Sequence, residues 1–334
     1  MSIPSSMNAV EITTPGAPDV LKLCTTEVPV AGPYEVLIRV HAAGVNRPDC
    51  MQRRGLYKVP ADASIYPGLE VAGEIVSCGA EVSRWRPGDR VVALTHGGGY
   101  AEFCKSNEGH CLRWPESLSS IEAAALPETC FTVQHNLLTR ASLSANDTVL
   151  IHGGSSGIGT TAIQVAKAIG AQVITTAGSD KKCQYCIELG ADHAINYRTR
   201  DWFEQAEKIT AGHGVDVVLD MVAGPYVEKN LNLLALDGRY AMIAFLLGPQ
   251  AEVNFMPVLS KRLTLTGSML RPQTAAQKSA IAADCKSTMW PLIDSGQLRS
   301  VVHASFPLPD AASAHELMES SEHLGKIVLT TEHS

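Results

Sequence analysis

The sequence lacks any long apolar run. No stretch of its 334 residues approaches the roughly 18 uninterrupted apolar residues that predict a membrane-spanning helix. Its first ten residues, MSIPSSMNAV, contain neither the basic segment nor the apolar core of a secretory signal. We therefore predict a cytoplasmic protein that has no membrane partner.

Basic clusters are also missing. The formal net charge is −7, with 27 Lys and Arg against 34 Asp and Glu, and no run of Lys or Arg stands out. A surface that binds duplex nucleic acid needs a basic face, so nucleic acid is not an expected partner. A hydrophobic fraction of 45% and a charged fraction of 18% instead indicate a soluble globular protein, long enough for two domains.

A framework of paired cysteines is absent as well. The nine cysteines are scattered along the chain, and an odd number without a disulfide pattern indicates reduced thiols. Only Cys183 and Cys186 have C-x-x-C spacing, in the segment SDKKCQYCIELG, which reads as a helix. Because no second pair accompanies them, two ordinary helix cysteines are favoured over a zinc or redox site, and no metal site is predicted.

The first 120 residues or so contain short β runs and turns. EVLIRVHAAGV alternates apolar and polar residues, EVAGEIVSCG and DRVVALT repeat that character, and RWRPGDR is typical of a turn. This part of the chain is predicted to be an irregular β-barrel. The closing segment GKIVLT is predicted to return to it as a strand, which makes this domain discontinuous, over residues 1–124 and 271–334.

Helices and strands alternate over residues 125–270. SSIEAAALPETCFTVQHNLLTRA is predicted to be helical, with Ser119 or Ser120 as its N-cap. Fully apolar strands such as TVLIHGG and VDVVLDMV then alternate with helices such as GIGTTAIQVAKAIG. That order indicates an α/β domain with a doubly wound parallel sheet of the Rossmann type.

The turn IHGGSSGIGT, residues 151–160, follows a strand and opens a helix, as a phosphate-binding turn does. Its glycines fit two patterns. One is a dinucleotide fingerprint with serine at the middle position, and the other is the turn of a short-chain dehydrogenase. The second pattern requires a Tyr-x-x-x-Lys downstream, which Tyr197, Tyr226 and Tyr240 do not provide, and about 145 residues precede the turn. The dinucleotide pattern is therefore favoured.

The end of the next strand, TTAGSDKK, bears on the choice of coenzyme. NAD sites usually place an acidic residue here to bind the ribose 2′-hydroxyl group, but Thr176 and Ala177 are uncharged. Ser179 and Lys182 can bind a 2′-phosphate, which favours NADPH. Asp180 would repel a phosphate, so weaker use of NADH stays open.

Several ordered motifs resemble one family over nearly the whole chain. They are GVNRPDCMQRRGLY, PGLEVAGEI, RPGDRVVAL, AAALPET, LIHGGSSGIGTTAIQ, TAGSDKK, ALDGRY, TGSMLR and GKIVL. The chain resembles the zinc-free medium-chain dehydrogenases/reductases of the quinone oxidoreductase (zeta-crystallin-like) group, especially the tumour-suppressor-inducible subgroup. The resemblance implies a GroES-like catalytic domain, a Rossmann domain, an active cleft between them and a homodimer.

The resemblance also implies roles for individual residues. Asn46 and Tyr57 would orient the substrate and nicotinamide, and Asn46 would also contact the coenzyme. The remaining coenzyme contacts are expected at Thr132, Ser156, Gly157, Ile158, Ser179, Lys182, Tyr197, Phe245, Leu246, Leu247, Ser268, Met269, Leu270, His323 and Leu324. Zinc-dependent relatives need Cys at position 46 and His at position 69, where this chain has Asn46 and Leu69, and Glu70 is expected to be a structural charge.

The chemistry suggested by these motifs leaves three functions open. The first is NADPH-dependent quinone reduction, in which Tyr57 orients a carbonyl group and no metal is needed. The second is reduction of an alkenal, an enone or an enoyl thioester on the same fold. The third is an NADPH-binding regulatory or RNA-binding protein with little turnover. Arg53 and Arg54 are expected to be solvated surface charges rather than substrate ligands.

Overall fold

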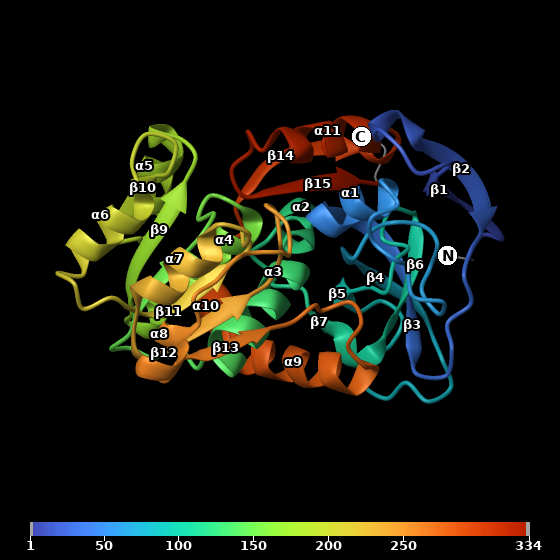
Figure 1. The fold of residues 1–334 in the computed structure, drawn as a ribbon. Coiled ribbons are helices and arrows are strands. Elements are labelled where there is room, and N and C mark those ends of the chain that lie inside the picture. Colours follow the sequence, from blue (N-terminus) through green and yellow to red (C-terminus); the bar gives the residue numbers. More distant parts are fainter. Residues whose placement is uncertain (1–2, 332–334) are drawn as a thin grey trace. The chain divides into compact units, whose positions relative to one another are not determined.

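The computed structural model describes residues 3–331, which form two compact units. One unit, which we call the catalytic unit after the role that the resemblance implies, contains the chain up to Thr129 together with Arg271–Asp294 and the chain from Ser300 onward. The coenzyme unit contains Cys130–Leu270 and Ser295–Arg299. Figure 1 shows both units with their elements labelled.

The catalytic unit is built on a sheet of seven strands. Their order is β14-β15-β3-β4-β5-β7, and β6 pairs with β3. All pairs are antiparallel except β14 with β15. The strands are β3 (Glu35–Val45), β4 (Glu70–Cys78), β5 (Arg90–Leu94), β6 (Phe103–Asn107), β7 (Cys111–Arg113), β14 (Val302–Pro307) and β15 (Lys326–Thr330). Because β15 pairs with β3, the predicted return of the last strand is confirmed.

Shorter elements surround this sheet. A separate antiparallel pair joins β1 (Ser6–Ile12) to β2 (Leu21–Glu27). The helices of the unit are α1 (Arg47–Arg53), α2 (Ser120–Ala124), α9 (Ala275–Thr288), α10 (Trp290–Asp294) and α11 (Ala311–Ser320), with short 3-10 turns η1 (Pro18–Val20), η2 (Glu108–His110) and η4 (Leu308–Asp310). One apolar core joins residues of β3, β4 and β5 to residues of α11 and β15, so the two ends of the chain share one core.

The coenzyme unit contains the predicted Rossmann sheet. Its six strands are all parallel, in the order β10-β9-β8-β11-β12-β13. They are β8 (Thr148–Ile151), β9 (Gln172–Ala177), β10 (His193–Asn196), β11 (Val215–Asp220), β12 (Leu234–Met242) and β13 (Thr264–Gly267). The order reverses between β8 and β11, which is where sheets of this kind bind their ligand, at the carboxyl ends of the strands.

The helices of the coenzyme unit follow the strands. They are α3 (Pro127–Val133, which begins in the catalytic unit), a π-helical segment η3 (Gln134–Arg140), α4 (Gly157–Ile169), α5 (Asp180–Glu188), α6 (Trp202–Ile209), α7 (Tyr226–Leu233) and α8 (Met256–Ser260). In α4 the Ser156 hydroxyl caps the first turn, and Gly170 ends the helix with a left-handed φ of 98°, a conformation that glycine adopts without strain. These local signals explain why the predicted helix has these bounds.

The helical stretch predicted from Ser119 onward is interrupted. Ser119 is its N-cap, because the Ser119 and Glu122 side chains form a capping box. The first helix ends at Ala124, and the next begins at Pro127. Proline lacks a backbone N–H and clashes with the preceding helical turn, so a continuous helix is not possible at this point.

Candidate active site

The glycine-rich turn lies at the carboxyl end of the central strand β8. Gly153 has a φ of 71°, which glycine tolerates without strain. At Gly159 a Cβ would lie 2.3 Å from the carbonyl oxygen of Gly153, so the helix can start this close to the strand only with glycine. The backbone N–H groups of Gly157 and Ile158 belong to the first turn of α4 and are available to an anion.

The Ser156 hydroxyl is already used within the turn. It accepts a hydrogen bond from the backbone N–H of Gly159 at 3.0 Å and lies 3.6 Å from the sulfur of Met221. Met221 follows β11, and its carbonyl accepts a hydrogen bond from the Leu246 N–H at 3.1 Å. The segment from Phe245 to Leu247 is therefore anchored beside the end of β11, and Met221 connects it to the fingerprint turn.

Ser268 and Thr132, both predicted to contact the coenzyme, are connected through Asn136, which the sequence analysis did not single out. The Ser268 hydroxyl donates to Oδ1 of Asn136 at 2.8 Å, and Nδ2 of Asn136 donates to the carbonyl oxygen of Thr132 at 3.1 Å. Asn136 is 3% exposed. It fixes the start of the segment Ser268–Leu270, which follows β13, relative to Thr132 in α3. Met269 itself is exposed.

The segments after β9 and β10 lie at the same carboxyl edge of this parallel sheet as the glycine-rich turn. Ser179 is the N-cap of α5, and Tyr197 is held next to it because its N–H donates to the Ala177 carbonyl at 3.1 Å. A Cβ at Gly178 would lie 2.8 Å from the Tyr197 hydroxyl oxygen and 3.5 Å from Nε of Arg198. Tyr197 therefore lies beside Gly178 and Ser179, together with Arg198, which the sequence interpretation missed. The backbone N–H of Lys182 donates to the Ser179 hydroxyl at 3.3 Å.

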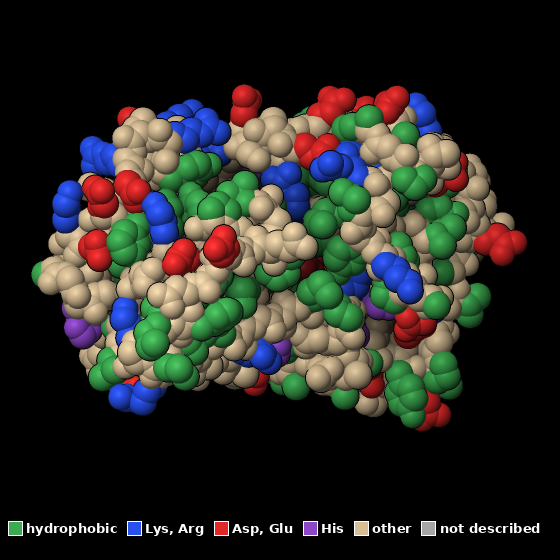
Figure 2. All heavy atoms as spheres, in the orientation of Figure 1, with side chains coloured by type: hydrophobic (Ala, Val, Ile, Leu, Met, Phe, Trp, Pro, Cys, Tyr) green, Lys and Arg blue, Asp and Glu red, His purple; other side chains and the backbone are tan. Residues whose placement is uncertain are grey.

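Asp180 is turned toward a neighbouring amide. Its Oδ1 accepts a hydrogen bond from Nδ2 of Asn196 at 2.8 Å. Lys181, Lys182, Arg198 and Arg200 belong to the same two loop and helix segments. Figure 2 shows several Lys and Arg side chains over this end of the unit, interspersed with Asp and Glu. The YRTR sequence after β10 was the signal that could have identified Arg198 in advance.

In the catalytic unit, Asn46 is the N-cap of α1. Its backbone N–H donates to Oδ2 of Asp49 at 2.9 Å. Nδ2 of Asn46 donates to Oε1 of Glu70 at 2.9 Å, and Nζ of Lys326 donates to Oδ1 of Asn46 at 2.6 Å. Asn46 is 7% exposed, so its amide is fixed on both sides.

The centre of this cluster is a buried ion pair. Nζ of Lys326 lies 2.6 Å from Oε1 of Glu70, and the two side chains are 5% and 0% exposed. Oε2 of Glu70 accepts the backbone N–H of Glu128 at 2.8 Å, and Lys326 also donates to the Val45 carbonyl at 3.0 Å. The expectation that Glu70 is a structural charge agrees with these contacts, since each carboxylate oxygen is bonded inside the unit.

Two carboxyl groups next to this pair are perturbed. Burial raises the pKa of Asp49 to about 6, even though it accepts hydrogen bonds from the Asn46 and Gly68 N–H groups. Burial, followed by repulsion from Glu70, raises the pKa of Glu128 to about 8. A large share of Glu128 is therefore protonated and neutral at pH 7.

Tyr57 lies between α1 and β4, in a segment of turns and bends. Its ring is half-buried, and the guanidinium carbon of Arg271 lies 5.5 Å from the ring centroid. Burial raises the pKa of the Tyr57 hydroxyl, which therefore stays protonated and able to donate a hydrogen bond at neutral pH. Leu324 lies elsewhere in the unit, in the loop before β15, where its N–H donates to Nδ1 of His303 at 3.3 Å.

The interpretation of Arg53 as a solvated charge was wrong. Its side chain is 1% exposed, donates twice to the Glu319 carboxylate at 2.8 and 2.9 Å, and donates from Nε to the Gly16 carbonyl. Arg53 therefore ties α1 to α11 through an ion pair in which the Glu319 side chain is 26% exposed. Arg54 is 55% exposed and lies 3.8 Å from Glu319, as expected for a solvated charge.

Comparison with known proteins also indicates a GroES-like part and a dehydrogenase part, and the similarity to one relative covers 97% of the chain. Residues 32–142 match the family described as alcohol dehydrogenase GroES-like domain, and residues 157–283 match the family described as zinc-binding dehydrogenase. A quinone oxidoreductase from Sus scrofa is 33% identical over 326 residues, which covers 97% of each chain.

Two solved structures are similar over almost their full lengths. A Pseudomonas syringae quinone oxidoreductase is 29% identical, with a TM-score of 0.85 and coverage of 97% of this chain and 99% of that one. The CurK enoyl reductase is also 29% identical with a TM-score of 0.85, and the match covers 98% of this chain and 99% of that one.

The chain belongs to the quinone oxidoreductase group of the medium-chain dehydrogenases/reductases. It is therefore an oxidoreductase with a nicotinamide coenzyme. Within the described residues 3–331 of this dehydrogenase/reductase, no helix is long and apolar enough to cross a membrane.

Asn46, Glu70 and Lys326 do not form a zinc ligand set. Zinc prefers His, Cys and carboxylate ligands in groups of three or four. Over residues 3–331 no group of three or more His, Cys, Asp or Glu could hold a metal ion. Where Asn46 and Glu70 meet, the ammonium group of Lys326 already supplies the positive charge.

His152, next to the fingerprint turn, is fully buried. Its Nε2 lies 2.8 Å from Oδ1 of Asn230 and its Nδ1 lies 3.1 Å from Oγ1 of Thr176, and burial lowers its pKa. Its ring is enclosed by Trp202 and Tyr226. These contacts make His152 part of the core of the coenzyme unit rather than a base that a substrate could reach.

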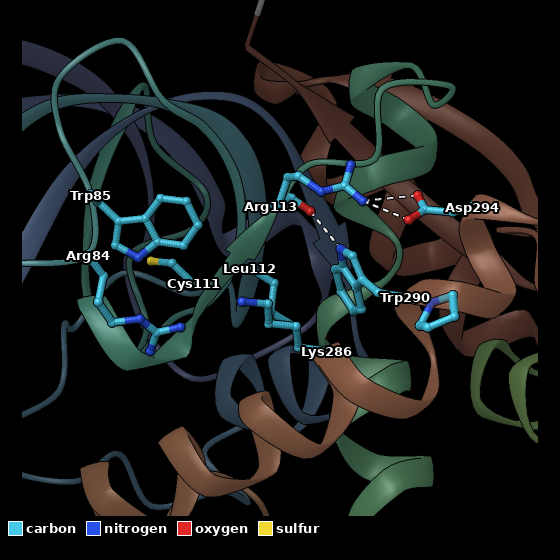
Figure 3. Close-up of a pocket in the computed structure, with 9 residues that line it drawn as sticks. Arg84, Trp85, Cys111, Leu112, Arg113, Lys286, Trp290 and Asp294 are labelled. Carbon is cyan, nitrogen blue, oxygen red and sulfur yellow. Dashed lines mark hydrogen bonds and ion pairs between the residues drawn. The ribbon is translucent and has the colours of Figure 1, made fainter.

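A cavity of about 450 Å³ is also present in the catalytic unit, next to β7 and α10. Figure 3 shows the Arg113 guanidinium paired with Asp294, and the Trp290 ring N–H donating to the Arg113 carbonyl at 2.8 Å. The remaining lining residues are Arg84, Trp85, Cys111, Leu112, Lys286 and Pro291. None of the predicted coenzyme or substrate residues lines this cavity.

Proposed function

We propose that this enzyme reduces quinones with NADPH and without a metal ion. The observation that carries the proposal is the cluster of Asn46, Glu70 and Lys326. The Lys326 ammonium lies 2.6 Å from Oδ1 of Asn46 and 2.6 Å from Oε1 of Glu70. Asn46 and Leu69 stand where zinc-dependent relatives need a Cys and a His ligand. The quinone oxidoreductases among its relatives support the choice of substrate.

Quinones suit a site of this kind. They accept hydride readily, and the product oxyanion is a weakly basic phenolate that water can protonate, so neither a Lewis acid nor a strong general acid is required. NADPH supplies the hydride when it is bound. The protein then has to orient the acceptor and exclude water, and Tyr57, whose pKa is raised by burial, serves as a protonated donor to the acceptor carbonyl.

NADPH is the proposed coenzyme because of the residues after β9 and β10. Ser179, Lys182 and Arg198 offer one hydroxyl and two cations, the donors that a 2′-phosphate needs. The carboxylate of Asp180, which would oppose a phosphate, is engaged by Asn196 at 2.8 Å. Use of NADH is proposed to be weaker.

A steady-state assay tests the reaction itself. Oxidation of NADPH is followed by absorbance with a panel of ortho- and para-quinones, and turnover above the uncatalysed rate is expected. Tyr57→Phe removes one hydrogen bond to the acceptor, so kcat/KM should fall about tenfold, corresponding to about 1.4 kcal/mol. Tyr34→Phe, at a residue that is 57% exposed, is the matched control and should leave kcat/KM unchanged.

The same assay separates the other functions. The CurK enoyl reductase shares the fold, and enone reduction needs a proton on carbon as well as hydride, so turnover of enones but not quinones would replace the proposal by that activity. Absence of turnover with both classes would leave a binding or regulatory protein, and an RNA complex that NADPH abolishes would then support the third function.

We also propose that the enzyme is a homodimer. Strand β13 ends the sheet order, and within residues 3–331 no strand pairs with its outer side. Near it, Phe255, Met256 and Leu259 are 62%, 63% and 76% exposed, and an edge strand beside exposed apolar side chains is typical of an interface between copies. Light scattering should give twice the chain mass, and Leu259→Glu should shift it toward the monomer; a monomeric mass for the parent protein would contradict the proposal.

The cytoplasm is the proposed location. Within residues 3–331, which include all nine cysteines, no disulfide is formed, and burial raises the pKa of Cys186, in the C-x-x-C segment, to about 12. Such thiols are unreactive and fit a reducing compartment. Recovery of the protein in a membrane or secreted fraction would contradict this location.

A further inference from the structure

Arg271 is buried with part of its hydrogen-bonding capacity unused. It lies between β13 and α9 in the catalytic unit and is 5% exposed. Its Nη1 donates to Oε1 of Gln52 at 2.7 Å. Its Nε and Nη2 are buried and have no hydrogen-bond partner among residues 3–331.

A second buried cation lies beside it. Nζ of Lys278 donates to the Arg271 carbonyl at 2.8 Å, and Lys278 is 4% exposed. Among the salt bridges of the described part of the chain, none involves Arg271 or Lys278. A buried charge without a counter-ion is costly, so buried cations are normally paired with an anion.

The acidic groups nearby do not remove this excess charge. Glu128 and Asp62 are the carboxyl groups that raise the pKa of Lys278, while burial and Arg271 lower it. Glu128 has a pKa of about 8, so it is largely neutral at pH 7. Asp62 is exposed and is engaged by Nε2 of His96 at 3.2 Å. The positive charges of Arg271 and Lys278 are therefore not neutralised by the carboxyl groups around them, and a bound anion would neutralise one of them.

Tyr57 connects this charge to the proposed acceptor. Its ring covers the guanidinium of Arg271 at 5.5 Å, and its hydroxyl is the donor assigned above to the acceptor carbonyl. The segment from Arg54 to Leu69 has no helix or strand, so Tyr57 can move aside without breaking a strand ladder. An acceptor that moves the ring aside would reach the guanidinium of Arg271, whose Nε and Nη2 have no partner among residues 3–331.

We propose that Arg271 and Tyr57 form a subsite for a negatively charged oxygen of the acceptor. The enzyme then favours planar conjugated acceptors that carry a carboxylate, a sulfonate or an ionised hydroxyl group. The inference rests on the proposed function, because it specifies the class of quinone that the same site takes. Arg271 offers two N–H groups on one side of a planar cation, which match the two oxygens of a carboxylate.

The coenzyme is the other source of anionic oxygens, and a binding experiment separates the two. The full chain is saturated with NADP⁺ and titrated calorimetrically with 2-naphthoate or with its neutral analogue 2-naphthamide. The parent protein should bind the carboxylate at least tenfold more tightly than the amide. Arg271→Gln should remove that preference while changing the affinity for NADPH less than threefold.

Control variants keep the test independent of folding. Arg86→Gln, at a side chain that is 87% exposed, should retain the full preference. Gln52→Glu leaves Arg271 in place but provides an internal carboxylate at its Nη1, so it should weaken naphthoate binding about tenfold even if Arg271→Gln does not fold. Thermal unfolding of each variant establishes that it is folded.

Kinetics then extend the result to acceptors. With 1,4-naphthoquinone-2-sulfonate, Arg271→Gln should raise KM at least tenfold, whereas with 2-methyl-1,4-naphthoquinone it should change KM less than threefold. Equal effects on both acceptors, equal affinity of the parent protein for acid and amide, or a matching loss of NADPH affinity would each overturn the subsite. Failure of quinone turnover with an intact, Arg271-dependent naphthoate preference would instead overturn only the proposed reaction.

Discussion

Replacing Lys326 with methionine is expected to destabilise the catalytic unit by about 3–5 kcal/mol, because the substitution leaves the Glu70 carboxylate buried without its counter-ion. The Glu70 side chain is 0% exposed and its Oε1 lies 2.6 Å from Nζ of Lys326. Methionine has nearly the volume of lysine, so packing is retained and the loss is electrostatic. Urea unfolding followed by tryptophan fluorescence measures the change.

Two further variants identify the cause of that loss. Glu70→Gln combined with Lys326→Met removes both charges, so it should recover a large part of the stability. Lys105→Met breaks a surface pair, since Lys105 is 45% exposed and lies 2.9 Å from Glu35, and it should cost less than about 1 kcal/mol. If the Lys326 and Lys105 variants lost equal stability, the buried pair would not be the cause.

Replacing Ser179, Lys182 and Arg198 together with alanine is expected to weaken NADPH binding about 100-fold. Hydrogen bonds to a charged phosphate contribute about 1.5–3 kcal/mol each, and the energies of neighbouring groups do not add fully. NADH lacks the 2′-phosphate, so its affinity should change less than threefold. Thermal-shift titrations with each coenzyme measure both effects, since tighter binding gives a larger stabilisation.

The matched control for this prediction is Lys208→Ala. Lys208 is an exposed residue in the last turn of α6, and its loss removes one positive charge from the same unit, where the triple variant removes two. It should leave both coenzyme affinities unchanged. A parent protein that NADH stabilises as strongly as NADPH would contradict the assignment of these residues to the phosphate.

The sequence predicted the elements whose signals are local. The strand over Glu35–Val45 and the Ser119–Glu122 capping box both appear in the structure where they were expected, although most residues of the strand are buried. The order of motifs led to the family and therefore to the Rossmann and GroES-like architecture. These features depend on residues a few positions apart, which a single sequence displays directly.

Features that depend on distant partners were not predicted. Arg53 pairs with Glu319 across 266 positions, so its own neighbours in the sequence gave no reason to bury it. Arg198 lies beside Gly178 only because β9 and β10 pair in parallel. That Nε and Nη2 of Arg271 have no hydrogen-bond partner among residues 3–331 can be recognised only when the positions of all surrounding polar atoms are known.

The pairing of β15 with β3 has a consequence for biosynthesis. The strand that supplies Lys326 leaves the ribosome well after β3 and Glu70, because it lies far behind them in the chain. The coenzyme unit, apart from Ser295–Arg299, is contiguous in the chain and can fold while translation continues. Residues 3–129, in contrast, must wait with the Glu70 carboxylate unneutralised until β15 has been synthesised.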